Sequence, residues 1–169
     1  LPELLDPWRA VELGSRFAGR LPLSSLPRLG DSLLDTAGEA ELKLVFGRDL
    51  EKRGVVTGTV KARLVLRCQR CLDALEYEVD APVALALVRG MDEAGELPEE
   101  YDPLLAADGL LRLADLVEDE LILSLPQIPM HEAGQCRAAA IDADDAEGFD
   151  GSAERENPFA VLADWRRED

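Results

Sequence analysis

Residues 55–79 read VVTGTVKARLVLRCQRCLDALEYEV, and apolar and polar side chains alternate on both sides of a turn that holds two cysteines. A period of two predicts two β-strands, each with one buried face. With Gln69 and Arg70 as a two-residue loop, the strands form a hairpin in which Cys68 faces Cys71, and a knuckle-shaped turn at the cysteines would give a nearby register. A slip of one residue would destroy the match of side chains on both faces at once. The expected pairs are Leu64 with Leu75, Ala62 with Tyr77, Val60 with Val79, Arg63 with Glu76, and Lys61 with Glu78.

The same alternation extends outward from this hairpin. Leu42, Leu44 and Phe46 predict an earlier strand that begins near residue 40, and the last strand continues to Val88. The connections between these strands are too short for parallel crossovers, so we expect antiparallel pairing. Residues 90–109 are acidic, contain two prolines and are expected to form a loop.

Three helices are expected to pack on the sheet. Asp6 as N-cap and Pro7 at the first position predict a short N-terminal helix. Ser24 or Ser25 could cap a second helix, whose apolar residues are Leu26, Leu29, Leu33 and Leu34. Residues 110–125 predict the longest helix, with one apolar stripe made of Leu113, Leu116, Val117, Leu121 and Leu125.

The predicted fold is therefore an α+β domain at residues 1–136, with an antiparallel, barrel-like sheet and packed helices. Residues 137–156 are rich in Ala, Asp, Glu, Gly and Ser, which predicts an acidic mobile linker. Asn157-Pro158 predicts the start of a short C-terminal helix within residues 157–169. This helix is expected to dock through an apolar face made of Phe159, Leu162 and Trp165.

The formal charge of −17 lies almost wholly in the second half of the chain. Residues 1–90 carry 13 acidic and 13 basic side chains, whereas residues 91–169 carry 22 acidic and 5 basic ones. Phosphate backbones favour Lys and Arg, so the first half is the one that could approach RNA. The second half suits a basic partner. The alternative is that the acids only keep the protein soluble.

Composition also disfavours several protein classes. No apolar run approaches the roughly 20 residues needed to span a bilayer, and no signal peptide is visible, so we expect a cytoplasmic protein without a membrane partner. Three cysteines do not make a disulfide framework. There is no phosphate-cradling glycine loop and no G-x-S-x-G motif, and the single histidine leaves none for a catalytic triad. We therefore expect neither an enzyme nor a small-molecule substrate.

Cys68, Cys71, His131 and Cys136 form a candidate metal site. The two cysteines of Cys68-Gln-Arg-Cys71 place two thiols on one side of a tight turn, and His131 and Cys136 follow on a proline-stiffened segment. Three cysteines and one histidine are a common tetrahedral shell for structural zinc, which would tie the hairpin to the segment after the long helix. Packed or exposed thiols are the alternative. Redox chemistry is the weakest reading, because reactive CxxC pairs usually begin a helix and this one is followed by a strand pattern.

A cluster of basic residues could contact RNA. Lys61 and Arg63 have acidic cross-strand partners in the predicted register, which leaves Arg48, Lys52, Arg53, Arg67 and Arg70 as candidates. No aromatic residue interleaves with them, so base stacking of the RNA-recognition-motif type is not supported.

Two segments could bind a protein partner. The acidic run Glu118, Asp119 and Glu120 could contact a basic protein, although such a run on a helix is more often a solvated face. Phe159, Leu162 and Trp165 could dock on their own sheet or in a groove of a partner.

Three blocks of this sequence resemble those of the YceD family of large ribosomal RNA subunit accumulation proteins. The blocks are Leu66–Leu72 (LRCQRCL); Leu116–Pro126 (LVEDELILSLP) with Pro129, His131 and Cys136; and Asn157–Leu162 (NPFAVL). The opening Leu5-Asp6-Pro7 is similar to the proteobacterial branch. Some branches of the family carry additional cysteines after the position of Cys136, which this sequence lacks.

The resemblance implies a non-enzymatic ribosome biogenesis factor, involved in the synthesis, processing or stability of large-subunit (23S) ribosomal RNA. It also implies a large-subunit precursor, ribosomal RNA or a basic ribosomal protein as the partner. It supplies no catalytic residue. The alternatives are a zinc- or thiol-dependent RNA-processing enzyme and a generic acidic protein-interaction module.

Overall fold

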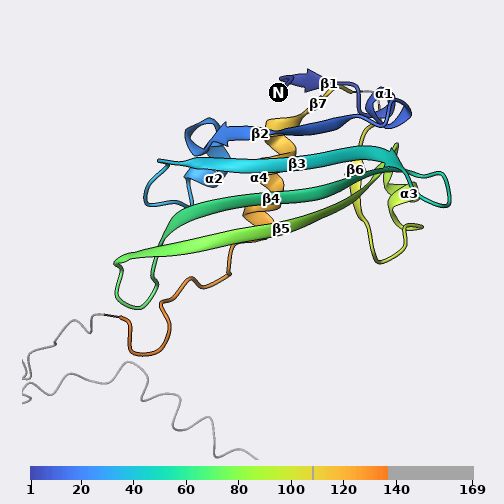
Figure 1. The fold of residues 1–169 in the computed structure, drawn as a ribbon. Helices are drawn as coiled ribbons and strands as arrows, with labels where there is room; N and C mark the ends of the chain where they lie inside the picture. The colour runs from blue at the N-terminus through green and yellow to red at the C-terminus, as the bar shows by residue number, and fades with distance from the viewer. Residues whose placement is uncertain (108, 137–169) are drawn as a thin grey trace, which may run out of the picture. The chain divides into compact units, whose positions relative to one another are not determined.

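The alternating segments form a five-stranded sheet with the strand order β2-β3-β4-β5-β6 (Figure 1). The structure is a computed structural model that describes residues 1–107 and 109–136, all within the compact unit Leu1–Cys136. Neighbouring strands from β2 to β5 are antiparallel, and β6 runs parallel to β5. The bounds of the strands are Arg16–Pro22 (β2), Glu39–Arg48 (β3), Gly54–Arg67 (β4), Ala74–Val88 (β5) and Asp102–Leu105 (β6).

One face of the sheet is apolar and is covered by helix α4, Leu113–Leu123, which crosses behind the strands in Figure 1. The core contains Leu42, Leu44 and Phe46 from β3, all buried, together with Leu116 and Leu121 from α4. Each such side chain contributes roughly 1.5–3 kcal/mol when fully buried. The remaining elements are short: α1 (Pro7–Glu12), α2 (Pro27–Gly30), α3 (Met91–Ala94), a 3-10 turn (Leu23–Ser25), and a two-stranded sheet of β1 (Leu4–Leu5) and β7 (Leu111–Arg112).

The N-terminal helix is confirmed, whereas the second helix is shorter than expected. Asp6 caps α1 by accepting a hydrogen bond of 3.0 Å from the Arg9 N–H, and Pro7 opens the first turn. Neither serine caps α2, which begins after Leu26 without a side-chain cap. The Ser25 hydroxyl instead donates to the Pro22 carbonyl oxygen at 2.7 Å.

The α+β class is confirmed, but the barrel-like closure is not. The sheet is open, and β2 and β6 are its two edges in the part of the chain that the structure describes. A small barrel would enclose its apolar face with its own strands. Here α4 covers that face, so the sheet and the helix form two layers.

The predicted register of β4 and β5 is wrong by two residues. Leu64 lies opposite Tyr77, and Arg63 lies opposite Glu78. The connection is longer than two residues, because Arg67 and Ala74 are the last pair and the Cys68 N–H donates to the Asp73 carbonyl oxygen at 3.0 Å. A shift of two residues leaves every side chain on the predicted face of the sheet, because side chains alternate between the faces. The predicted buried and exposed positions are therefore kept, although the cross-strand partners change.

The acidic segment between β5 and α4 is not only a loop, since it contains α3 and strand β6. Leu104 and Leu105 of β6 align with Leu87 and Val88 of β5. The connection from residue 89 to residue 101 is long enough for a crossover, which permits the parallel pairing that the sequence pattern excluded for the other strands.

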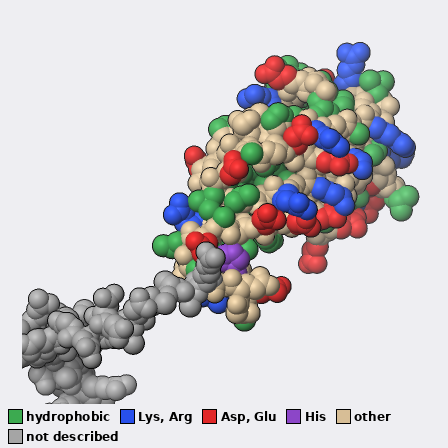
Figure 2. Space-filling model, turned by 60° about the vertical axis from the view of Figure 1, so that its left-hand side comes forward, with side chains coloured by type: hydrophobic (Ala, Val, Ile, Leu, Met, Phe, Trp, Pro, Cys, Tyr) green, Lys and Arg blue, Asp and Glu red, His purple; other side chains and the backbone are tan. Residues whose placement is uncertain are grey.

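The opposite face of the sheet carries charges of both signs. Lys61 pairs with Asp80 at 2.6 Å, and Arg63 pairs with Glu78 at 2.5 Å. Acidic and basic side chains are interspersed over the face seen in Figure 2. These exposed pairs contribute little energy, but they balance the charge of this face.

The expected linker at residues 137–156 and the expected C-terminal helix at residues 157–169, with Phe159, Leu162 and Trp165, lie outside the described residues. Among the described residues, no helix is both long and apolar enough to cross a membrane.

Gly58 in β4 permits the close approach of β3. A Cβ atom at this position would lie 1.9 Å from the Lys43 carbonyl oxygen. We therefore expect Gly58→Ala to lower the free energy of unfolding by about 2–3 kcal/mol, because the two strands must separate locally. Urea denaturation followed by circular dichroism measures this change.

Gly47→Ala in β3 is the matched control, because a Cβ atom there has no neighbour within 4 Å. This substitution should change the stability by less than about 1 kcal/mol. Equal effects of the two substitutions would contradict the steric argument.

Candidate metal centre

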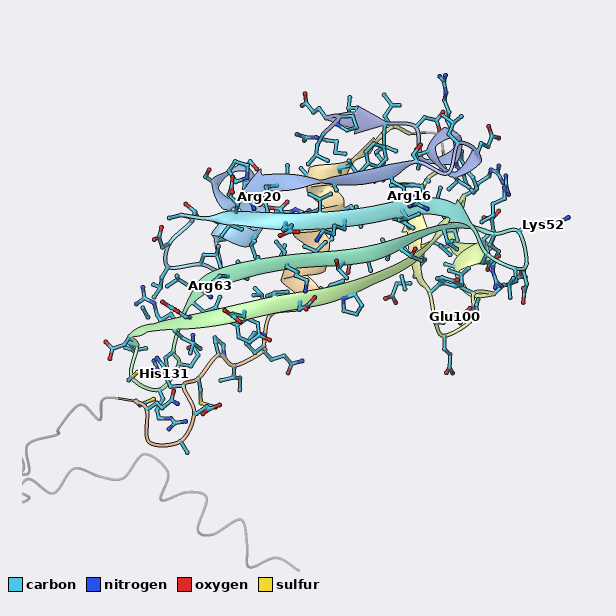
Figure 3. All side chains as sticks on the ribbon, in the orientation of Figure 1. Arg16, Arg20, Lys52, Arg63, Glu100 and His131 are labelled. Atoms are coloured by element: carbon cyan, nitrogen blue, oxygen red, sulfur yellow. The ribbon has the colours of Figure 1, made fainter. Side chains whose placement is uncertain are left out.

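Two segments far apart in the sequence bring Cys68, Cys71, His131 and Cys136 together. Cys68 follows the last residue of β4, and Cys71 lies in the turn that leads to β5. His131 and Cys136 come from the segment after α4, which is stiffened by Pro126 and Pro129. Figure 3 shows His131 at this end of the β4–β5 hairpin, beside sulfur atoms.

The ligand atoms of these four residues lie within 4.8 Å of one another. The Sγ atoms of Cys68 and Cys136 are 3.7 Å apart, and His131 Nδ1 lies 3.4 Å from Cys71 Sγ and 3.7 Å from Cys136 Sγ. A tetrahedral zinc ion with Zn–S of about 2.3 Å and Zn–N of about 2.0–2.1 Å separates its ligand atoms by roughly 3.6–3.8 Å. The three distances given above are close to this separation, and the remaining pairs of ligand atoms lie within 4.8 Å.

His131 is oriented by a hydrogen bond behind the cluster. Its Nε2 lies 3.1 Å from the Ala74 carbonyl oxygen, which can only accept a hydrogen bond. The proton is therefore assigned to Nε2, which leaves the lone pair of Nδ1 directed toward the sulfur atoms. This is the tautomer that a metal ligand requires.

The environment favours a thiolate at one of the cysteines. Burial raises the pKa of the Cys68 thiol, but the N–H groups of Cys71, His131 and Arg70 outweigh that effect and lower the pKa to about 5. Burial and the neighbouring thiols of Cys68 and Cys71 raise the pKa of Cys136 to about 11. Negative charge at Cys68 thus opposes ionisation of Cys136, and a cation between them would relieve this repulsion.

The cluster joins the hairpin to the segment after α4. The Gln69 N–H donates to the Pro129 carbonyl oxygen at 2.8 Å, which adds a backbone link next to the side-chain cluster. Leu72, with φ of 64°, lets the chain turn sharply between Cys71 and β5. If these four residues bound one metal ion, they would fill a tetrahedral shell, as protein ligands do in structural sites.

The five basic candidates for RNA contact lie at opposite ends of β4. Arg48, Lys52 and Arg53 lie at the turn between β3 and β4, and Arg67 and Arg70 lie beside the cysteine cluster. The 14 residues of β4 separate the two groups. At about 3.3 Å per residue this separation is roughly 40–45 Å. Figure 3 shows Lys52 and His131 at the two ends of the molecule, so the candidates do not form one patch.

Arg53 is engaged within its own turn. Its Nε lies 2.7 Å from the Asp49 carboxylate, its guanidinium also pairs with Glu51 at 2.8 Å, and it lies over the Tyr101 ring at 5.8 Å. Arg48 donates to the Lys52 carbonyl oxygen at 2.8 Å, and Arg70 contacts the His131 carbonyl oxygen at 3.4 Å.

The sequence alone did not reveal a pocket of about 510 Å³ beside the β3–β4 turn. The Arg89 guanidinium lies over the Trp8 ring at 4.4 Å there, and Glu12, Glu93 and Glu96 also line this pocket. The apolar run of residues 85–88, which is buried on both faces and ends at Val88, could have indicated Arg89 as the first exposed residue after β5.

The acidic run of α4 is not one solvated face, in contrast to the expectation from the sequence. Glu118 is only 3% exposed, and its carboxylate accepts hydrogen bonds from Arg28 Nε at 2.9 Å and from the Leu29 N–H at 3.1 Å. Asp119 is exposed and pairs with Arg28 at 2.7 Å, whereas Glu120 is half-buried. Glu118 therefore joins α2 to α4 and is not available on the surface.

Comparison with known proteins finds a family model and curated relatives that match this chain. A family model described as large ribosomal RNA subunit accumulation protein YceD matches residues 56–165. A relative from Haemophilus influenzae, named large ribosomal RNA subunit accumulation protein YceD, is 32% identical over 168 residues. The matched region covers 99% of this chain and 97% of the relative.

This chain belongs to the YceD family. The resemblance to YceD proteins inferred from three sequence blocks is thus confirmed. The YceD match spans all four residues of the cysteine and histidine cluster, together with β5 and α4. No solved structure matches the chain significantly.

Glu118→Ala is expected to lower the free energy of unfolding by about 2–3 kcal/mol, because the buried Leu29 N–H loses its acceptor and Arg28 loses a buried partner. Asp119→Ala is the matched control on the same helix and should cost less than about 1 kcal/mol, since Asp119 is exposed. Chemical denaturation of both variants measures the difference. A cost for Asp119→Ala as large as that for Glu118→Ala would show that burial is not the deciding factor.

The cluster is expected to bind one divalent transition metal ion per chain, because its four ligand atoms lie within 4.8 Å of one another, close enough to share one ion. Titration with Co²⁺ should give the absorption bands of a tetrahedral thiolate site and saturate at one equivalent. Cys71→Ser and His131→Gln should weaken binding strongly. Gln69→Ser, which changes an exposed residue of the same turn, should not. Equal binding by the Cys71→Ser variant would refute the site.

Proposed function

We propose that the protein is a non-enzymatic factor in the biogenesis of the large ribosomal subunit, required for the synthesis, processing or stability of its 23S ribosomal RNA. The similarity to the Haemophilus influenzae protein over 99% of this chain is the observation that carries the proposal. That relative is named for the accumulation of large-subunit ribosomal RNA, and the family model has the same description.

The proposed partner is a precursor of the large subunit, through its ribosomal RNA or a basic ribosomal protein, in the cytoplasm. The charge distribution supports this assignment. Residues 91–107 and 109–136 contain 11 acidic and one basic side chains, whereas the two signs are balanced over residues 1–90. An acidic surface favours contact with a basic protein and disfavours a phosphate backbone.

Contact with RNA is proposed for the basic groups at the ends of β4. Arg67 and Arg70 beside the cysteine cluster are one group, and Arg48 and Lys52 at the β3–β4 turn are the other. Because Arg53 is already paired with Asp49 and Glu51, we expect it to contribute the least to RNA binding.

The metal proposed for the cluster is structural zinc, because three thiols and an imidazole within 4.8 Å of one another are a ligand set that zinc favours. Zinc would hold the segment after α4 against the β4–β5 hairpin and would leave both available to a partner. Elemental analysis of the purified protein identifies the ion. Iron in place of zinc would contradict this assignment.

A thiol-dependent RNA-processing enzyme is the second candidate, since the pKa of Cys68 is lowered to about 5. Its support is weaker, because Cys68 is fully buried and a nucleophile must reach its substrate. A general acidic interaction module is the third candidate, and it predicts no effect on ribosomal RNA.

Deletion of the related gene in Haemophilus influenzae is expected to lower the ratio of 23S to 16S ribosomal RNA and the amount of free large subunits. Expression of this chain should restore both, because the two proteins are similar over nearly their whole length. RNA quantification and sucrose-gradient profiles measure the outcome.

In the same strain, Cys71→Ser should restore less 23S ribosomal RNA than Gln69→Ser, because only the former removes a metal ligand. An unchanged 23S to 16S ratio in the deletion strain would refute the ribosomal role. Cleavage of precursor ribosomal RNA by the purified protein alone would instead support the enzyme.

A further inference from the structure

A groove of about 310 Å³ lies between the edge strand β6 and helix α4, away from the metal cluster. Its floor is made by Leu85 of β5 and Leu116 of α4, both buried. Leu104 of β6 and Ile122 of α4 are partly buried and line the walls. Leu123, which also lines the groove, is 78% exposed and extends its apolar surface.

Acidic side chains surround this apolar groove. Asp102, Asp119 and Glu120 line it, and Arg28 is the only basic residue in the lining that residues 1–107 and 109–136 provide. Arg28 is already engaged by Glu118 and Asp119. In the described residues, Asp102 and Glu120 therefore have no basic partner within ion-pair distance.

The acids of the groove repel one another. Burial and the nearby carboxylates of Asp102 and Asp119 raise the pKa of Glu120. A positive charge between Glu120 and Asp102 would relieve this repulsion. A phosphate backbone would increase it, so RNA is a poor occupant of this groove.

The groove is also poorly suited to the addition of a strand from another protein. β6 has only four residues, and Pro103 in the middle of it has no N–H to donate to a neighbouring strand. A bound segment must therefore be held by its side chains, as when an amphipathic helix lies in a groove.

We propose that the groove between β6 and α4 binds a cationic amphipathic segment of a protein. An aliphatic side chain of that segment enters between Leu104 and Ile122, and Lys or Arg side chains lie against Asp102 and Glu120. The proposal adds a binding site to the proposed function. It rests on the proposed function only for the kind of partner, a basic ribosomal protein. The lining of the groove and its charges do not depend on which protein is the partner.

The test uses the full chain and a fluorescein-labelled synthetic peptide with Leu and Lys residues at helical spacing. Fluorescence anisotropy at physiological salt measures the affinity. The double substitution Asp102→Lys/Glu120→Lys is expected to weaken binding about tenfold or more, because it reverses both charges that face the cation. Leu123→Asn should weaken binding without a change of charge.

Glu99→Lys/Glu100→Lys is the matched control. Both residues are exposed in the segment before β6 and do not line the groove, and Glu100 points away from the molecule in Figure 3. Each double substitution changes the formal charge from −17 to −13. The control should therefore change the affinity less than about threefold, since only the total charge differs. Equal weakening by the two double variants would show attraction to the total charge only and would overturn the proposal.

Two peptides and one localisation experiment complete the test. A peptide with Glu in place of Lys, and one with Gln in place of Leu, should both fail to bind. Amide chemical shifts of the full chain should change at β6 and at the C-terminal half of α4 when the Leu and Lys peptide is added. Changes confined to another surface, or competition by RNA for the same shifts, would refute the groove. Because no ribosomal component is present, this outcome is independent of the 23S to 16S ratio that tests the proposed function.

Discussion

The pairing of β4 with β5 is the contact on which the rest of the structure depends. These are the longest strands, with 14 and 15 residues, and β3 and β6 pair on either side of them. Their inward side chains form the floor that α4 covers, and their outward side chains form the ion pairs of the polar face. Their connecting turn holds Cys68 and Cys71, so the pairing also positions half of the metal cluster.

Much of this arrangement follows from the sequence, because a period of two assigns each side chain of β3, β4 and β5 to a face. The four ligands could also be predicted, since the chain has only three cysteines and one histidine. The register could not be predicted, because it depends on the longer turn that the hydrogen bond from the Cys68 N–H to the Asp73 carbonyl oxygen closes, and residue types do not reveal this bond. Strand β6 was missed because acidic residues and Pro103 conceal a short apolar run.

The roles of the individual charged residues were harder to predict than the net charge of the chain. Glu118 and Arg28 are 90 positions apart, and no local pattern shows that one is buried against the other. Arg53 resembles its basic neighbours in the sequence but is held by Asp49 and Glu51. Folding thus buries or pairs some charged side chains. Others, such as Asp102 and Glu120, have no basic partner among the described residues. Whether a charged side chain is buried, paired or exposed depends on tertiary packing, which cannot be derived from composition.

The split of the metal cluster between two segments has a consequence for biosynthesis. Cys71 and His131 are separated by 60 positions in the chain. A nascent polypeptide that has emerged only as far as the hairpin offers two thiols, a pair too small to enclose an ion tightly. The coordination shell can close only after translation has passed Cys136 and α4 has packed on the sheet. The proposed metal ion would therefore be bound once this part of the chain is complete, not while the hairpin alone has emerged.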